Sequence, residues 1–115
     1  MLVMMGYKPG DILFAELTFA DGTGSKKRPV VVLSGETYNG RRQELIVAAV
    51  TSNVSRLLFG DTKIVQWEES GLKYPSHATG IIQTITQNGV LKKLGSLPRR
   101  DFESFKTNLK KTLEF

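Results

Sequence analysis

Two short runs of apolar, largely β-branched residues constrain the fold of this chain more than any other feature. Residues 28–34 read Arg-Pro-Val-Val-Val-Leu-Ser, and residues 45–50 read Leu-Ile-Val-Ala-Ala-Val. Runs of this kind predict buried β-strands. Because proline lacks the N–H that a ladder needs, we expect Pro29 near a strand start, with Arg28 at the boundary. If the two strands pair antiparallel, Arg28 meets Thr51, which follows the second run, at one rim of the sheet.

The rest of the chain predicts further short strands and one helix. Strands are expected at residues 12–19, 28–34, 44–51, 63–67, 79–86 and 90–97, with a polar connection at 35–43 and Asn-Gly turn signals at 39–40 and 88–89. After Pro98, apolar residues recur at helical spacing and predict an amphipathic helix of about four turns. The expected apolar face of this helix comprises Phe102, Phe105, Leu109 and Leu113. We therefore expect one mostly β domain over residues 1–115, a small bent barrel with minor α content; an open α+β sheet is the alternative.

Composition excludes several classes of site. The chain has no cysteine, so disulfides and thiolate metal sites are impossible, which fits a reducing, cytoplasmic location. It has neither a charged leader before an apolar region nor a run of about 20 apolar residues, so we expect no signal peptide and no membrane helix. With one histidine, no acidic cluster and no phosphate-loop motif, it is expected to use no metal and no cofactor.

Basic residues outnumber acidic ones and gather in short clusters. Sixteen Lys and Arg against eleven Asp and Glu give a net charge of +5. The clusters lie at residues 26–28, 41–42, 92–93 and 99–100. This local concentration indicates a polyanionic partner, because neutralising phosphates requires several cations close together.

Arginine, lysine, hydroxyls and amides are the groups that remain for a reaction. Such groups can cleave RNA without a metal, because the 2′-hydroxyl of the substrate supplies the nucleophile. The protein must align the chain, stabilise charge on the phosphate and move protons, and the planar fork of arginine suits the two non-bridging phosphate oxygens. The residues alone leave simpler interpretations open, with Arg28 as a surface cation and Thr51 as a β-former that ends a strand.

Several motifs occur in an order typical of one known family. They are Gly-Asp-Ile-Leu-Phe-Ala-Glu-Leu at 10–17, Lys-Arg-Pro-Val-Val-Val-Leu-Ser at 27–34, Ile-Val-Ala-Ala-Val-Thr-Ser-Asn at 46–53, Leu-Lys-Tyr-Pro-Ser at 72–76, Gln-Thr-Ile at 83–85 and Lys-Leu-Gly-Ser-Leu at 93–97. With these motifs nearly the whole chain resembles the MazF/PemK family of toxin endoribonucleases from type II toxin–antitoxin systems. The resemblance implies a small SH3-like barrel of the CcdB/PemK type, with a C-terminal helix, that forms a homodimer.

The resemblance also implies an activity and a partner. Members of the family are mRNA interferases that cleave single-stranded RNA sequence-selectively and without metal, leaving a 2′,3′-cyclic phosphate and a 5′-hydroxyl. A cognate antitoxin neutralises the toxin by wrapping a disordered segment around the dimer. The basic charge of this chain indicates that its antitoxin is acidic.

By the same resemblance, Arg28 is the phosphate clamp and proton donor, and Thr51 positions the phosphate. The residues expected to bind RNA are Lys26, Lys27, Ser52, Asn53, Gln83 and Thr84. His77 is a candidate acid or base because histidine titrates near neutral pH, although a lone histidine in a loop is more often a surface residue. Trp67 is a candidate for stacking a base, although a single tryptophan at a strand end is more often part of the core.

The chain departs from the family pattern at two places. Gly22 and Thr23 lie in a loop where many members carry an acidic residue, and Gln83 and Thr86 stand where several members carry an arginine and an aspartate. These departures leave the general base unassigned.

Two other functions fit the same barrel. A CcdB-like toxin acts by protein contact through its C-terminal end, but residues 110–115 lack the terminal Trp-Gly-Ile of CcdB. A non-catalytic nucleic-acid-binding barrel would bind RNA in a salt-sensitive manner and would release no cyclic phosphate.

Overall fold

The computed structural model describes residues 6–18 and 22–115. Within these residues the elements are β1 (Asp11–Thr18), β2 (Ser25–Val32), α1 (Glu36–Arg42), β3 (Glu44–Thr51), β4 (Thr62–Ile64), β5 (Ser76–Thr86), the 3₁₀ turn η1 (Gln87–Gly89), β6 (Val90–Ser96) and α2 (Arg99–Leu113). The expected mostly β fold with a C-terminal helix is confirmed. The predicted end of the first strand at Phe19 lies outside the described residues.

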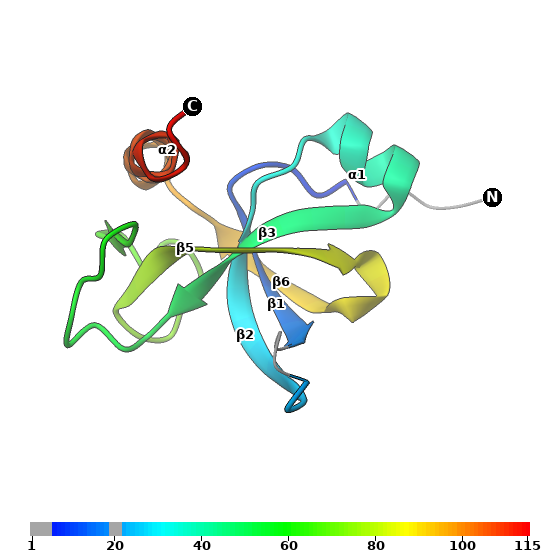
Figure 1. Ribbon diagram of the computed structural model, residues 1–115, viewed down its shortest axis with the longest axis horizontal. Coiled ribbons are helices and arrows are strands. Elements are labelled where there is room, and N and C mark those ends of the chain that lie inside the picture. The colour runs from blue at the N-terminus through cyan, green and yellow to red at the C-terminus, as the bar shows by residue number, and fades with distance from the viewer. Residues whose placement is uncertain (1–5, 19–21) are drawn as a thin grey trace.

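The strands form one sheet in the order β4-β5-β3-β2-β1-β6, and every neighbouring pair is antiparallel. Figure 1 shows β2 running steeply across the direction of β5, so the sheet is strongly twisted and bent. The helix α2 packs against β4 and β5. Among the described residues, no helix has the length and apolarity required to cross a membrane.

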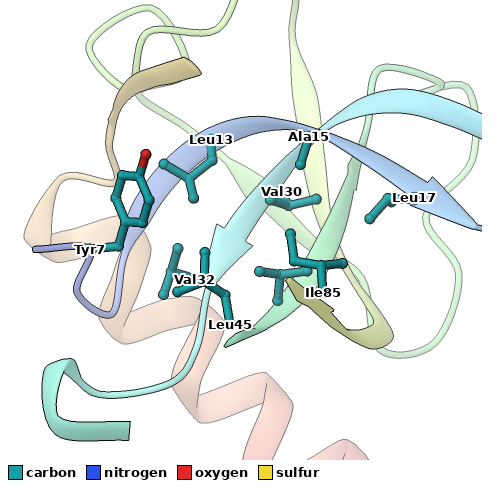
Figure 2. Close-up of a cluster of buried hydrophobic side chains, with 9 residues drawn as sticks. Tyr7, Leu13, Ala15, Leu17, Val30, Val32, Leu45 and Ile85 are labelled. Carbon is teal, nitrogen blue, oxygen red and sulfur yellow. The ribbon is translucent and has the colours of Figure 1, made fainter. Parts of the chain in front are cut away.

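Two apolar clusters lie on opposite faces of the central strands. One cluster, drawn in Figure 2, contains Tyr7, Leu13, Ala15, Leu17, Val30, Val32, Leu45, Val47 and Ile85. The other contains Ile12, Val31, Ala48, Val50, Ile64, Leu72, Ala78, Leu97 and Phe105. Because successive side chains on a strand point to opposite faces, the Val30-Val31-Val32 run supplies both clusters. This is why the run is apolar without alternation.

The strand β2 begins three residues earlier than expected, and Pro29 lies inside it, opposite Phe14. The prediction that Arg28 starts the strand is therefore wrong. The reason is that β2 pairs with β3 only at Val30–Val32, so the first half of β2 has an open edge on that side. A proline there removes no ladder hydrogen bond.

The predicted polar connection at 35–43 is also wrong, because residues Glu36–Arg42 form α1. The Asn-Gly signal does not produce a turn here, because the side chain of Asn39 is buried and hydrogen-bonds to residues outside the helix. Its Nδ2 donates to the carbonyl oxygens of Tyr7 at 2.9 Å and Ser34 at 3.1 Å, and its Oδ1 accepts from the Ser34 hydroxyl. The helix ends where Gln43 adopts a left-handed conformation with φ of 54°.

Smaller differences occur in the second half of the chain. The strand β4 is shorter than expected, because turns follow it from Val65 onward, and β5 begins earlier, at Ser76. On α2, Phe105 is buried and Phe102 and Leu109 pack against the second cluster, as expected. Leu113 does not pack against that cluster. It is the last residue of the helix and is 42% exposed.

The first turn of α2 is held by a buried carboxylate. Asp101 Oδ1 accepts the backbone N–H of Val65 at 2.9 Å, and Oδ2 accepts that of Gln66 at 2.8 Å. These two N–H groups follow β4 and find their acceptors on the helix. The contact therefore fixes α2 to the segment that leads toward β5.

We expect Asp101→Ala to lower the free energy of unfolding by about 3 kcal/mol, because it leaves two partly buried N–H groups without acceptors. Urea denaturation measures this loss. The matched control is Glu103→Ala on the same helix. Glu103 is exposed and pairs with Lys106 at 2.9 Å, a hydrogen-bonded contact that lowers the pKa of Glu103. Equal losses in the two variants would contradict the bracing role of Asp101.

Candidate active-site cavity

A cavity of about 420 Å³ opens on the sheet near the rim where β2 and β3 part. Its wall is built by β1, β2, β3, β6, the start of β5 and the segment that precedes β5. The lining residues are Phe14, Lys27, Arg28, Pro29, Val50, Thr51, Ser52, Asn53, Gly71, Leu72, Lys73, Tyr74, Ser76, Lys92 and Leu94.

The register of three strands builds one side of this cavity. Phe14 on β1 pairs with Pro29 on β2 and with Lys92 on β6. Directly opposed residues on neighbouring strands project to the same face, so these three side chains form a row across the sheet. Lys27 lies two residues before Pro29 and shares that face. The row therefore places an apolar pair between two cationic side chains.

Arg28 and Thr51 line the same cavity from adjacent strands. The β2–β3 ladder ends at the pair of Val30 and Ala49, and Arg28 and Thr51 each lie two residues beyond that pair. Arg28 is exposed and Thr51 is half-buried. The structure thus places a guanidinium-bearing residue and a hydroxyl-bearing residue at one solvent-accessible rim.

The end of β3 is ordered by a short polar turn. Thr51 Oγ1 accepts the backbone N–H of Asn53 at 3.1 Å. The Asn53 Oδ1 in turn accepts the Ser55 hydroxyl at 2.7 Å. A threonine hydroxyl that accepts one hydrogen bond can still donate one, so Thr51 can hydrogen-bond a ligand oxygen.

Two glycines set the position of the opposite wall. Gly71 has φ of +87°, and a Cβ added to it would lie 2.0 Å from the Leu94 carbonyl oxygen. A Cβ on Gly95 would lie 2.5 Å from the Ser70 carbonyl oxygen. The two backbones therefore approach as closely as they do because both residues lack side chains. This approach holds the Leu72-Lys73-Tyr74 segment beside β6.

The electrostatic character of the cavity is cationic. Lys27, Arg28, Lys73 and Lys92 line it, all four are exposed, and the lining contains no Asp or Glu. None of the four makes an ion pair within the part of the chain that the structure describes. Over the same residues no group of three His, Asp or Glu is placed to hold a metal ion. The arrangement suits an anion with several oxygens.

Four residues expected at the site lie elsewhere. Lys26 does not line the cavity, and neither do Gln83 and Thr84, which lie far along β5. Gln83 is occupied structurally, because its Nε2 donates to the Thr18 carbonyl at 2.7 Å. His77 is on β5 rather than in a loop and is buried, so the expectation of a surface loop histidine is wrong.

The sequence reasoning missed three cavity residues, Lys73, Tyr74 and Lys92. Lys92 was recognisable only as half of a basic doublet, and its placement depends on the register of β6 against β1. Its neighbour Lys93 faces the other way and pairs with Asp11 at 3.4 Å. Lys73 and Tyr74 lie in the Leu-Lys-Tyr-Pro-Ser motif at 72–76, and that motif was the available signal.

A small, strongly bent antiparallel β fold with a C-terminal helix and a cationic cavity defines a compact β protein suited to binding a polyanion. Residues 8–113 match the model of the family described as PemK-like, MazF-like toxin of type II toxin-antitoxin system. Since the match spans most of the sequence, the chain belongs to this family. No curated protein sequence matches the chain.

Solved structures share the fold. An endoribonuclease from mycobacterial species superimposes with a TM-score of 0.78 at 13% identity, covering 99% of this chain and 97% of its own. The Mycobacterium tuberculosis toxin MazF-mt6 gives 0.75 at 23% identity, with coverages of 91% and 97%. An endoribonuclease in complex with its cognate antitoxin, also from mycobacterial species, gives 0.75 at 13%, with coverages of 95% and 96%. At these identities the likeness establishes the fold.

We expect Gly71→Ala to destabilise the protein by about 3 kcal/mol, because the new methyl group overlaps a backbone oxygen and the positive φ is strained. Thermal and urea denaturation measure the change. Gly22→Ala is the matched control, since Gly22 has φ of +75° but nothing within 4 Å of the added Cβ. It should cost only about 1 kcal/mol, the backbone penalty alone. Similar losses at both positions would show that the close approach to β6 is unimportant.

Proposed function

We propose that this chain is the toxin of a toxin–antitoxin pair and acts as a metal-independent, sequence-selective endoribonuclease on single-stranded RNA. The observation that carries the proposal is the cavity that Arg28 and Thr51 line together with three lysines, with no acidic residue in the wall. Family membership supports the toxin role. The structural neighbours described as endoribonucleases support the reaction type.

The proposed reaction is internal transesterification of RNA. The 2′-hydroxyl oxygen attacks the adjacent phosphorus and loses its proton, the bond from phosphorus to the 5′ oxygen breaks, and that oxygen receives a proton. The products are a 2′,3′-cyclic phosphate and a 5′-hydroxyl. No water, metal or cofactor enters the balance of this step. The protein therefore contributes alignment, charge stabilisation and proton delivery.

Arg28 is assigned as the group that stabilises the transition state and delivers the proton to the leaving oxygen. A guanidinium donates two parallel N–H bonds to the non-bridging oxygens. The proton that Arg28 delivers to the leaving oxygen is made up by the proton that the 2′-hydroxyl loses, so the guanidinium is restored at the end of the step. The stabilisation that these hydrogen bonds provide is larger in the transition state, because negative charge grows on those oxygens.

Thr51 is assigned as the positioning group. Its oxygen accepts the Asn53 N–H, so the hydroxyl hydrogen is directed to another acceptor. A phosphate oxygen held by Arg28 is an acceptor at this rim. The same turn presents Ser52 and Asn53 at the cavity, where they can hydrogen-bond the neighbouring nucleotides.

The remaining cations are assigned to the RNA backbone. Lys27, Lys73 and Lys92 surround the rim from β2, the segment before β5, and β6. A row of cations that follows a phosphate backbone is the usual basis for binding single strands.

The proposal extends to partners and location. One structural neighbour is an endoribonuclease bound to its cognate antitoxin, and the net charge of +5 favours an acidic antitoxin for this chain. We further propose that the toxin acts as a homodimer in the cytoplasm, where its RNA substrate is found.

Arg28→Ala should reduce the rate of RNA cleavage by about 10²–10³-fold, the range for losing one preorganised charge-stabilising donor. Mixed single-stranded RNA is incubated with purified protein in EDTA, and the ends are analysed for cyclic phosphate. Arg28→Lys should recover little, because an ammonium lacks the planar fork. Arg100→Ala on α2 is the control for lost positive charge. Cleavage that requires a metal, or that survives Arg28→Ala unchanged, would refute the proposal; binding without cleavage would indicate a non-catalytic barrel.

Lys73→Ala and Lys92→Ala should each weaken RNA binding and flatten its salt dependence. For a single strand, each lost phosphate contact lowers the slope of log affinity against log salt by about 0.7. Fluorescence anisotropy with a 2′-O-methyl oligonucleotide, which lacks the attacking hydroxyl, measures this slope. Lys106→Ala is the control, because Lys106 pairs with Glu103 on α2 outside the cavity. A slope that changes as much in the control would place the RNA elsewhere.

A further inference from the structure

A second cavity, of about 580 Å³, lies at the other side of the β3–β5 end. Its wall combines the start of β5, β4 with the turn after it, and the loop between β3 and β4. The lining residues are Val54, Leu57, Lys63, Ile64, Val65, Trp67, Pro75, Ser76 and His77. Trp67, the candidate for stacking a base, and His77, the candidate acid or base, are both among them.

His77 is the unusual group in this cavity. It is only 5% exposed, and its Nδ1 is buried without a hydrogen-bond partner among the described residues. A buried N–H without an acceptor is far rarer in proteins than a buried lone pair without a donor. Nδ1 is therefore assigned as the lone-pair nitrogen, which leaves Nε2, at the opposite edge of the ring, as the N–H donor of His77.

The other walls of the second cavity are apolar and open to solvent. Trp67 is half-buried and packs against the second apolar cluster. Val54, Leu57 and Val65 are 41%, 62% and 54% exposed. A flat apolar ligand with hydrogen-bond acceptors on its edge fits such a wall, because the faces meet apolar side chains while an edge atom accepts from His77. Nucleobases have this character.

The second cavity is adjacent to the proposed active site. Ser76 lines both cavities. The β3–β5 ladder ends with Thr51 directly opposite His77, and His77 is paired on its other side with the exposed Lys63. A strand whose phosphate lies at Thr51 therefore passes beside His77, with Lys63 available for a further phosphate.

We propose that the Trp67–His77 cavity is a nucleobase subsite that holds a base of the same RNA strand cut at Arg28 and Thr51. The base packs on Trp67 and the apolar residues of the β3–β4 loop and accepts a hydrogen bond from His77 Nε2. His77 then contributes to substrate selection rather than to proton transfer. This inference rests on the proposed RNA-cleaving function.

The intrinsic fluorescence of the protein gives a direct test, because Trp67 is its one tryptophan. Short 2′-O-methyl oligonucleotides of adenine, cytosine or uracil should quench Trp67 fluorescence in the intact protein. Inorganic polyphosphate, which offers phosphates without bases, should bind the lysines and leave the fluorescence unchanged. Arg28→Ala should slow cleavage by about 10²–10³-fold, while a saturating concentration of oligonucleotide still quenches Trp67, which separates the base subsite from the chemistry.

Variants test the role of each group. Trp67→Leu should weaken binding of the oligonucleotide about tenfold. His77→Phe keeps the ring but lacks the donor, and it should raise KM about fivefold while kcat stays near the original value. His77→Gln places an amide N–H near the Nε2 position and should restore KM. Phe59→Ser is the matched control, because Phe59 is an exposed apolar residue of the same loop and lines neither this cavity nor the first.

Each outcome decides the proposal. If RNA is bound and cleaved while Trp67 fluorescence and the KM of His77→Phe are unchanged, the base subsite is refuted and the nuclease stands. Quenching by the antitoxin but not by RNA would refute it in favour of a protein-binding cavity. A loss of kcat alone in both His77 variants would also refute it, since His77 would then act in the chemistry. Base-dependent quenching in a protein that does not cleave RNA would support the subsite and refute the nuclease.

Discussion

The candidate active site depends on the register of β2 against its two neighbours. Val30, Val31 and Val32 are fully buried and supply the apolar clusters on both faces of the sheet, so the cost of shifting the strand is large. A slip of one residue would turn each side chain to the opposite face. The same register sets Pro29 opposite Phe14, and Arg28 and Thr51 line one cavity just beyond the last β2–β3 pair. The chemistry at the rim is thus fixed by burial a few residues away, and the rim itself can remain exposed and cationic.

A second constraint holds the wall that faces this rim. The backbones around Gly71 and Gly95 approach too closely for a side chain on either residue, and Asp101 satisfies two N–H groups in the turn that leads to Gly71. Both contacts act on the segment between β4 and β5, which has little regular structure. That segment carries Lys73 and Tyr74 to the cavity. Irregular backbone can be positioned reproducibly when its polar groups are paired and its close contacts admit one arrangement.

Local patterns in the sequence predicted the strands and the C-terminal helix because apolar periodicity and burial agree there. They failed where a tertiary contact overrode a local preference. Asn39-Gly40 signals a turn, yet three hydrogen bonds to Asn39 hold it in α1. Pro29 signals a strand start, yet the open edge of β2 accepts it within the strand. The two apolar runs alone were enough to predict that Arg28 and Thr51 lie at one rim of the sheet. Lys92 and His77 could not, because their places depend on β6 and β5 ladders whose register no short motif specifies.

The loop between β3 and β4 contributes residues to both cavities. Its first residues, Ser52 and Asn53, line the cationic cavity, and Val54 and Leu57 line the apolar one. The end of β3 is anchored by its ladders, so Thr51 and His77 keep their relation whatever the loop contains. In the proposed reaction the nucleophile comes with the substrate, so that reaction needs only the anchored rim. Changes in the loop can therefore alter which bases fit while the guanidinium and hydroxyl stay in place. A fold arranged in this way can keep one reaction while its target sequence varies. The proposed reacting groups and the proposed base-binding residues lie on different sides of the end of β3.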